Sequence, residues 1–404
     1  MVLAAVTALL GMALAVLGQG ESWVHALRIL AVVGAVTATA LLLDLGAPRR
    51  DRLLLPIAAL LISLGVILIS RVDGNLAAKQ ILWVLIGCAG LIATYFLADP
   101  VVGLSNWKYL AGVGALALMA VTVIFAPEKN GARLWLSLAH RFSFQPSEIA
   151  KLLMVVFLAG YVAERGHLLR LVQRLRGGAG LQWRYLAPMI LMVLLCLGLF
   201  VGQRDLGTAG LFFGIFVVML YLATGRSLHA VGSLLAFALG VIVAYHAFPH
   251  LATRFTAWLY PWANINGVGY QPAQGMFALA EGGVTGSGLG VLSVAKNLPE
   301  ASSDMIFAVL GQDLGLAGSV AVLLLYALFI TTGYRIAWRA RDSFNGLLAT
   351  GLTTMFALQA FIIVAGVLRV IPLTGLPLPL MAYGGTSMLA NCIGLGLLLA
   401  VSRE

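Results

Sequence analysis

The sequence predicts an all-α protein that crosses a membrane many times. Of its 404 residues, 61% are hydrophobic and only 10% are charged, and the mean hydropathy is +1.00. The apolar residues fall into runs of about 17–25 residues, the length that a helix needs to cross a bilayer. We count twelve such runs, at about residues 2–19, 27–44, 53–70, 80–98, 109–126, 147–164, 185–202, 206–224, 228–247, 305–333, 345–367 and 383–401.

The runs divide the chain into a short N-terminal part and a larger body. The first run has no charged side chains before it, so we interpret it as a span rather than a signal peptide. Residues 1–46 therefore supply two additional N-terminal helices, which precede a basic hinge at 47–50. Residues 53–401 supply ten further spans and include one large loop, at about 248–304.

The positive charges set the orientation. With the N-terminus inside the cell, the densest arginine cluster, between Arg165 and Arg184, lies on the cytoplasmic side, as expected from the excess of Lys and Arg in cytoplasmic loops. The net charge of +10 therefore indicates topology and contact with anionic lipid. No basic domain with interleaved aromatic residues is present, so a nucleic-acid partner is not expected.

The three cysteines also exclude two kinds of site. Cys88, Cys196 and Cys392 all lie inside apolar runs and are far apart in the sequence. This pattern implies neither a disulfide framework nor a zinc site.

Three segments on the predicted outer side carry most of the candidate chemistry. They are residues 127–147, 249–304 and 368–387, and all three are rich in Gly, Pro, aromatic and polar residues. Loops held by a rigid scaffold often carry function. We therefore expect an enzyme or receptor site that faces outward.

The second outer segment ends in a carboxylate at the mouth of a membrane helix. Asp304 directly precedes the apolar run that starts at Met305. One interpretation is that Asp304 caps this helix. The other is that it is a general base at the boundary between water and lipid, where partial desolvation raises the pKa of a carboxyl group.

The first outer segment places two opposite charges in the following helix. Pro146 is suited to the start of a helix, and Glu148 and Lys151 follow one turn apart. They form either a buried ion pair or a direct contact with substrate. Deeper in a later span, Asp313 is either functional or paired with an Arg or Lys.

Other polar residues leave two interpretations open. Asp205 either caps the following helix or accompanies an Arg204 that meets a phosphate. In the large loop, the aromatic residues are typical membrane anchors, and the glycines allow close approach to a phosphate. Residues 372–379 form a broken segment after Arg369, either buried in the protein or an ordinary surface loop.

Five ordered motifs resemble one known family. They are Gln145-Pro146-Ser147-Glu148 with Lys151, Gln203 to Thr208, Gly269-Tyr270-Gln271, Pro299-Glu300 to Asp304, and Tyr383-Gly384-Gly385-Thr386-Ser387. In this order they are similar to the shape, elongation, division and sporulation (SEDS) family, whose members include RodA, FtsW and SpoVE. The resemblance covers residues 53–401, and it implies a ten-helix core to which two N-terminal helices are added.

The resemblance implies a peptidoglycan glycosyltransferase. Such proteins polymerise lipid II at the outer face of the bacterial cytoplasmic membrane, together with a class B penicillin-binding protein that crosslinks the strands. Asp304 matches the essential acid of the family and is the expected base. The diphosphate that leaves with its undecaprenyl chain needs cations, either Arg and Lys side chains or a divalent ion such as Mg²⁺ or Mn²⁺. The candidate substrate-binding residues are Arg133, Glu148, Lys151, Arg204, Arg254, Gln271, Lys296, Glu300, Arg369 and Ser387.

Two other functions fit part of the pattern. Intramembrane charges and a broken helical segment also occur along transport pathways, so a lipid II flippase or another transporter is the alternative. A third possibility is a non-catalytic scaffold for division or elongation. The scaffold predicts that substitutions of Asp304 have no effect on glycan synthesis.

Overall fold

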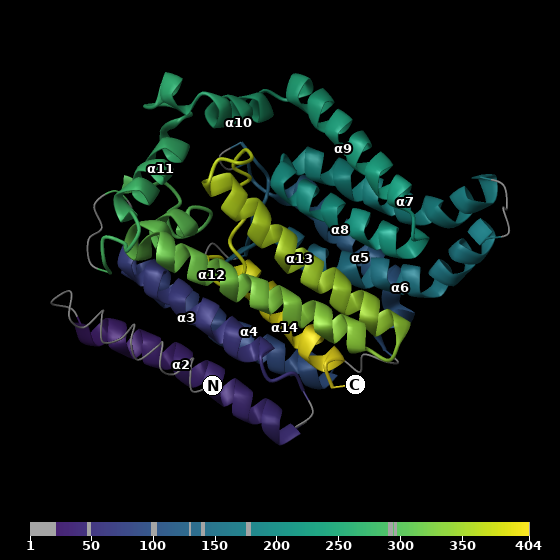
Figure 1. The fold of residues 1–404 in the computed structure, drawn as a ribbon, viewed down its shortest axis with the longest axis horizontal. Coiled ribbons are helices and arrows are strands. Elements are labelled where there is room, and N and C mark those ends of the chain that lie inside the picture. The colour runs from purple at the N-terminus through teal and green to yellow at the C-terminus, as the bar shows by residue number, and fades with distance from the viewer. Residues whose placement is uncertain are drawn as a thin grey trace.

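The computed structural model describes residues 22–46, 50–97, 103–128, 131–138, 142–174, 179–289, 294 and 297–403. In this part of the chain the fold is a bundle of long helices (Figure 1). The long helices are α2 (Ser22–Gly46), α3 (Leu54–Val72), α4 (Gly74–Leu97), α5 (Lys108–Phe125), α6 (Pro146–Arg174), α7 (Ala179–Gln203), α8 (Leu206–Thr224), α9 (Ser227–Ala247), α12 (Ile306–Arg339), α13 (Ser343–Val367) and α14 (Gly385–Val401).

The predicted spans agree closely with these helices. Eleven of the twelve apolar runs coincide with a long helix, and the first run, at 2–19, lies outside the described residues. Within the described ranges, nine helices are long and apolar enough to cross a membrane, and two shorter apolar stretches are Leu30–Leu45 and Gly385–Val401. The bilayer fixes the length of a spanning helix, and this is why the run lengths identified the helices.

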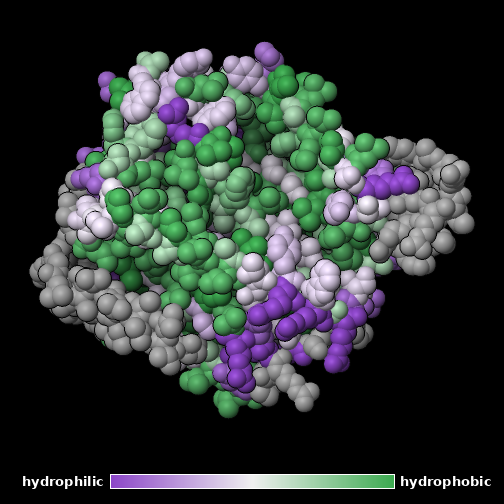
Figure 2. All heavy atoms as spheres, viewed as in Figure 1, coloured by the Kyte–Doolittle hydropathy of each residue, from purple (hydrophilic) through white to green (hydrophobic). Residues whose placement is uncertain are grey.

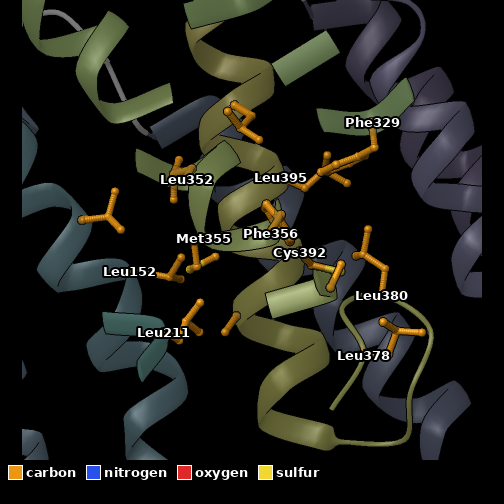
Figure 3. Packing of buried hydrophobic residues seen from close by; sticks show 14 of the residues in the cluster. Leu152, Leu211, Phe329, Leu352, Met355, Phe356, Leu378, Leu380, Cys392 and Leu395 are labelled. Carbon is orange, nitrogen blue, oxygen red and sulfur yellow. The ribbon is translucent and has the colours of Figure 1, made fainter. Parts of the chain in front are cut away.

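The core lies where α6, α8, α12, α13 and α14 meet. Figure 3 shows Leu152 of α6, Met355 and Phe356 of α13, and Leu395 of α14 converging on one another, and all four are buried. By contrast, no residue of α9 is buried. Because α9 is apolar on all sides, its exposed side chains suit contact with lipid, and much of the visible surface is hydrophobic (Figure 2).

The segment between α13 and α14 enters the interior without forming a helix. Leu376, Leu378 and Leu380 in this segment are buried. Its carbonyl groups accept hydrogen bonds from other elements, for example from Gln359 Nε2 to Pro377 O at 2.8 Å. The interpretation as a buried broken segment is therefore confirmed, and the alternative of an ordinary surface loop is wrong.

The three outer segments gather at one end of the bundle. They contain the hairpin of β1 (Leu136–Leu138) and β2 (Phe142–Phe144), and the short helices α10 (Pro249–Leu259), η2 (Pro261–Asn264) and α11 (Tyr270–Gly282). Gln145 N donates to Thr386 Oγ1 at 3.1 Å, and Tyr383 N donates to Ser302 O at 2.7 Å. These contacts join segments that are far apart in the sequence.

Candidate active site

Asp304 lies at the end of the large loop, two residues before α12 begins. The residue that caps α12 is Met305, and no side chain caps the first turn of this helix. The interpretation of Asp304 as a helix cap is therefore wrong. Its carboxylate accepts a hydrogen bond from the Ser303 hydroxyl at 3.2 Å and forms no ion pair with any described residue.

The Asp304 side chain lines a pocket of about 230 Å³ between α10, α11, the start of α12 and the segment that follows α13. Four of the residues singled out from the sequence meet here, namely Asp304, Arg254, Gln271 and Arg369. The other lining residues are Thr253, Ala257, Trp258, Val268, Pro272, Gly366, Leu373 and Gly375. The pocket thus combines one carboxylate, two guanidinium groups and one amide.

Arg254 reaches into this pocket from α10. Its Nη1 donates to Thr374 O at 3.0 Å, which ties α10 to the broken segment. Within the described residues it forms no ion pair with a carboxylate. Its positive charge therefore remains available to an anionic ligand.

Arg369 is held in the same wall by Trp258. Arg369 Nη2 donates to Trp258 O at 2.7 Å, and Trp258 Nε1 donates back to Arg369 O at 2.9 Å. The backbone of Arg369 has a φ of 57°, a left-handed conformation that side chains other than glycine rarely adopt. The aromatic composition of this loop predicts lipid anchors, and no local signal in the sequence indicates this role of Trp258.

The surroundings of Asp304 favour its protonated form. Loss of hydration around the carboxyl group, followed by the nearby Glu300 carboxylate, raises the pKa of Asp304 to about 6. Hydrogen bonding and Arg254 act in the opposite direction. The Ser303 hydroxyl lies 2.9 Å from Glu300 Oε2 and 3.2 Å from Asp304 Oδ1. The resulting pKa suits a group that must accept a proton near neutral pH.

Glu148 and Lys151 lie elsewhere, inside the protein. Lys151 Nζ lies 2.9 Å from Glu148 and 3.1 Å from Gln359 Oε1, and both charged side chains are buried. The predicted intramembrane ion pair is therefore confirmed. Ser387 is also buried, on α14, where Asn391 Nδ2 donates to its hydroxyl at 3.4 Å.

Arg133 and Arg204 share a carboxylate outside the pocket. Arg204 Nη1 lies 2.7 Å from Glu128 Oε1, and Arg133 Nε lies 4.0 Å from the other oxygen of Glu128. Asp205 accepts a hydrogen bond from Thr208 N at 3.0 Å, which confirms it as the cap of α8. Lys296 lies outside the described residues.

Asp313 pairs with a basic residue, one of the two outcomes expected for it. Arg71 Nε, at the end of α3, lies 3.3 Å from Asp313 Oδ2 in α12. Both side chains are largely inaccessible to solvent. This pair therefore links two helices, and neither residue lines the Asp304 pocket.

An apolar groove of about 450 Å³ lies between the helices next to the Asp304 pocket. Arg254 lines both the groove and the Asp304 pocket. The groove walls include Leu197 of α7, Phe237 of α9 and Ile362 of α13. A lipid chain in the groove would place its polar end next to Arg254.

The described residues contain no group of three or more His, Cys, Asp or Glu side chains that could hold a metal ion. Asp304 is the one carboxylate among the residues that line the pocket. Mg²⁺ is usually held by one or two carboxylates together with water and the phosphates of a substrate. A divalent ion at this pocket would therefore take most of its ligands from a bound phosphate and from water.

A family model for FtsW, RodA and SpoVE, described as "Cell cycle protein", matches residues 51–404. The chain belongs to this family. It is 41% identical to the peptidoglycan glycosyltransferase RodA of Mycobacterium tuberculosis over 372 residues, which cover 88% of the chain and 79% of the relative. It is 32% identical to stage V sporulation protein E of Bacillus subtilis, with 87% and 97% covered.

Two solved structures resemble this chain in fold, which agrees with its membership of the FtsW, RodA and SpoVE family. One, from a study of polymerization and crosslinking by a peptidoglycan synthase complex, aligns with a TM-score of 0.72 at 26% identity and covers 88% of the chain and 98% of its own. The crystal structure of the rod shape determining protein RodA of Thermus thermophilus aligns with a TM-score of 0.65 at 25% identity, with 88% and 97% covered. The chain is thus an all-α, multi-pass membrane protein.

Proposed function

We propose that the protein is a peptidoglycan glycosyltransferase that polymerises lipid II, with Asp304 as its general base. The observation that carries the proposal is the Asp304 pocket. A carboxyl group with a raised pKa shares this pocket with Arg254 and Arg369, neither of which forms an ion pair in the described part of the chain. A base beside unpaired cations is what the transfer of a sugar from a diphosphate requires.

The reaction forms one bond and breaks one. The 4-hydroxyl oxygen of the GlcNAc of lipid II attacks the anomeric carbon of the lipid-linked strand, and the bond from that carbon to the diphosphate oxygen breaks. Asp304 takes the hydroxyl proton, because a neutral hydroxyl is a poor nucleophile. Arg254 and Arg369 stabilise the negative charge that develops on the undecaprenyl diphosphate.

The apolar groove suits the lipid part of the substrate. Its walls come from helices that face the bilayer, and Arg254 stands where the groove meets the Asp304 pocket. A polyprenyl chain in the groove therefore brings its diphosphate to Arg254 and its sugar towards Asp304. Binding of the polyprenyl chain in the groove also fixes the position of the anomeric carbon that reacts.

The proposed reaction takes place at the outer face of the membrane and involves a partner protein. The Asp304 pocket faces outward from a bacterial cytoplasmic membrane, because the arginine-rich loop lies at the other end of the helices. The partner is a class B penicillin-binding protein, which crosslinks the product. A Mg²⁺ or Mn²⁺ ion that enters with the diphosphate remains a prediction, and no step above depends on it.

The charges expected along a transport pathway are engaged inside the protein, which argues against the flippase alternative. Glu148 pairs with Lys151, and Asp313 pairs with Arg71. A transporter would need such groups to be accessible in turn from each side. The Asp304 pocket, in contrast, opens beside a groove that suits a lipid-linked sugar.

The test is polymerisation of labelled lipid II by the purified protein, reconstituted with its transpeptidase. We expect Asp304→Asn to lower the rate by about 100-fold or more, because general bases contribute about 10²–10⁴-fold. Asp73→Asn is the control, because Asp73 lies outside the pocket. Its carboxylate accepts a hydrogen bond from Asn75 N at the start of α4. Asn caps a helix as well as Asp does, so this substitution removes an acid without loss of the cap. Near-normal polymerisation by folded Asp304→Asn would exclude Asp304 as the base. Head-group translocation without polymer would support the flippase.

A further inference from the structure

A second polar pocket lies at the opposite end of α12 from Asp304. Its volume is about 300 Å³, at the lower end of the range of about 300–1,000 Å³ that is typical of small-molecule sites. It is lined by residues 50–52, which lead from the hinge into α3, and by the last turn of α12 and the end of α14. The lining residues are Arg50, Asp51, Arg52, Arg335, Ile336, Arg339, Ala340, Val401 and Ser402.

Only two of the four arginines in this basic pocket have acidic partners. Arg335 Nη2 lies 2.7 Å from Asp51 Oδ2, and Arg50 Nη2 lies 2.7 Å from Asp44 Oδ1. Arg52 and Arg339 line the same space, yet neither side chain has a hydrogen-bond or ion-pair partner among the described residues. Within the described part of the chain, two of the positive charges of the basic pocket therefore have no acidic partner.

The single negative charge of Asp51 is already paired with Arg335. Its Oδ1 accepts from Leu53 N at 2.9 Å and Leu54 N at 3.1 Å, at the start of α3, while its Oδ2 accepts from Arg335. Its backbone N–H donates to Ser402 Oγ at 3.1 Å. These bonds hold the hinge against α12 and α14, so the arginines surround a pocket whose walls are fixed.

We propose that the basic pocket binds the phosphate group of an anionic phospholipid in the cytoplasmic leaflet. Guanidinium groups bind phosphate oxygens through paired hydrogen bonds, and basic pockets between membrane helices on the cytoplasmic side suit lipid head groups. Arg52 and Arg339 hold the phosphate, and Arg50 and Arg335 add to the positive potential. The site is separate from the glycosyltransfer chemistry, which takes place at the other end of the helices.

The neighbouring surface favours a lipid over a soluble anion. Leu53, next to Arg52, is 52% exposed. Trp338 is 92% exposed in the same last turn of α12 as Arg339, although it lies on another face of the helix, beside α8. Tryptophan is enriched where a membrane meets water, so Trp338 indicates that this turn lies at the depth of the lipid head groups. Figure 2 shows hydrophilic residues gathered around this end of the molecule beside a largely hydrophobic surface. A head group in the basic pocket would therefore leave its acyl chains against apolar side chains.

A bound phosphate would connect parts of the chain that are distant in sequence. Arg50 Nη2 donates to Ala40 O at 3.0 Å, so the hinge is joined to α2 as well as to the basic pocket. Arg339 ends α12, which starts beside Asp304. A lipid bound in the basic pocket would thus stabilise the contact between α2 and the ten-helix core, because Arg50 touches both the pocket and α2.

The test compares two double variants of the full-length protein. Arg52→Gln/Arg339→Gln removes the unpaired charges of the basic pocket. Arg165→Gln/Arg226→Gln removes two charges from the same side of the membrane at positions that do not line it. Native mass spectrometry measures the affinity for phosphatidylglycerol, with phosphatidylcholine as the neutral lipid, and unfolding curves report stabilisation by each lipid.

We expect the pocket variant to bind phosphatidylglycerol about tenfold more weakly than the control variant. It should also lose most of the rise in unfolding temperature that this lipid gives, while polymerisation of lipid II at saturating lipid continues. Equal loss of affinity in both variants would overturn the proposal, because it would show a general charge effect. Equal stabilisation by inorganic phosphate alone would also overturn it, because the occupant would then be a soluble anion.

Discussion

Arg254 and Asp304 approach the same side of Gly375. Arg254 Nη2 and Asp304 Oδ2 each lie 3.8 Å from the point that a Cβ atom on Gly375 would occupy. The two groups are near enough for Arg254 to lower the pKa of Asp304, but they do not form an ion pair. The carboxylate therefore remains free to accept a proton, and the guanidinium remains free to bind a diphosphate.

The polymerisation rate should depend on the ionisation of Asp304. Its pKa lies near 6, above the ordinary value of 3.8, so the basic form appears only as pH rises through about 6. We expect the rate to fall tenfold for each pH unit below that point and to be level above about pH 7. Single-turnover rates between pH 4.5 and 8 measure this profile. A rate that stays constant down to pH 4.5 would contradict the assignment.

The same raised pKa has a consequence for stability. A carboxyl group that binds its proton more tightly in the folded state makes the protein less stable as pH rises from about 4 to 6. Asp304→Asn, which cannot ionise, should therefore unfold at the same temperature as the wild type or higher at pH 7. Thermal unfolding in detergent measures this effect. A clear decrease in the unfolding temperature would indicate a structural role for Asp304 instead.

Two substitutions of Arg254 distinguish the effect of its positive charge from the effect of its hydrogen-bonding geometry. Arg254→Gln removes a cation that lowers the pKa of Asp304, so the midpoint of the pH profile should move upward. The rate at pH 7.5 should also fall by about 100-fold, because a donor to the leaving group is lost. Arg254→Lys retains the charge and should leave the midpoint near 6 while still slowing the reaction. Identical midpoints in both variants would show that Arg254 does not influence Asp304.

A methyl group on Gly375 should disturb the Asp304 pocket more than it disturbs the fold. Gly375 has a φ of 75°, so Gly375→Ala should cost about 1–2 kcal/mol of stability. The new carbon would also contact both Arg254 Nη2 and Asp304 Oδ2, each at 3.8 Å, and would take up space that a substrate needs beside them, so we expect polymerisation to fall by about tenfold or more.

Gly131 provides a matched control for this strain. Its φ is 78°, and no neighbouring atom lies within 4 Å of the position of a Cβ atom there. Gly131→Ala should therefore lower the unfolding temperature to a similar extent and leave polymerisation nearly intact. Equal loss of activity in both variants would mean that strain alone explains the effect of Gly375→Ala. Unfolding curves and polymerisation assays on the same preparations decide between these outcomes.

The sequence predicted those features that depend on local physics. Apolar run lengths identified the helices, and the placement of Asp304 before an apolar run identified the carboxylate of the pocket. The ion pair of Glu148 and Lys151 also followed from helical spacing. Each of these depends on neighbours within a few residues of one another.

The sequence could not predict contacts between distant segments. Trp258 and Arg369 exchange hydrogen bonds across 111 residues, and no local pattern records this pairing. For the same reason the sequence does not predict the ion pair between Arg204 and Glu128. Arg204 and Arg254 look alike as outer cations in the sequence, and only the fold shows that one is paired with a carboxylate and the other is not.

The ion pair of Glu148 and Lys151 should matter for stability rather than for contact with substrate. Lys151→Met leaves the Glu148 carboxylate buried without its cation, which should lower the free energy of unfolding by about 3–5 kcal/mol. Glu148→Gln/Lys151→Met removes both charges together, so we expect it to recover most of this loss. Chemical unfolding of the single and double variants in detergent measures the difference.

Activity then distinguishes the two interpretations of this pair. Both side chains are buried, and neither lines the Asp304 pocket or the apolar groove. If the pair serves only the fold, the double variant should polymerise lipid II at a rate within a few-fold of the wild type once stability is recovered. If the pair instead contacts substrate, the double variant will be stable and inactive. Stability without activity is therefore the result that would contradict a structural role, because no cost of folding could then explain the lost reaction.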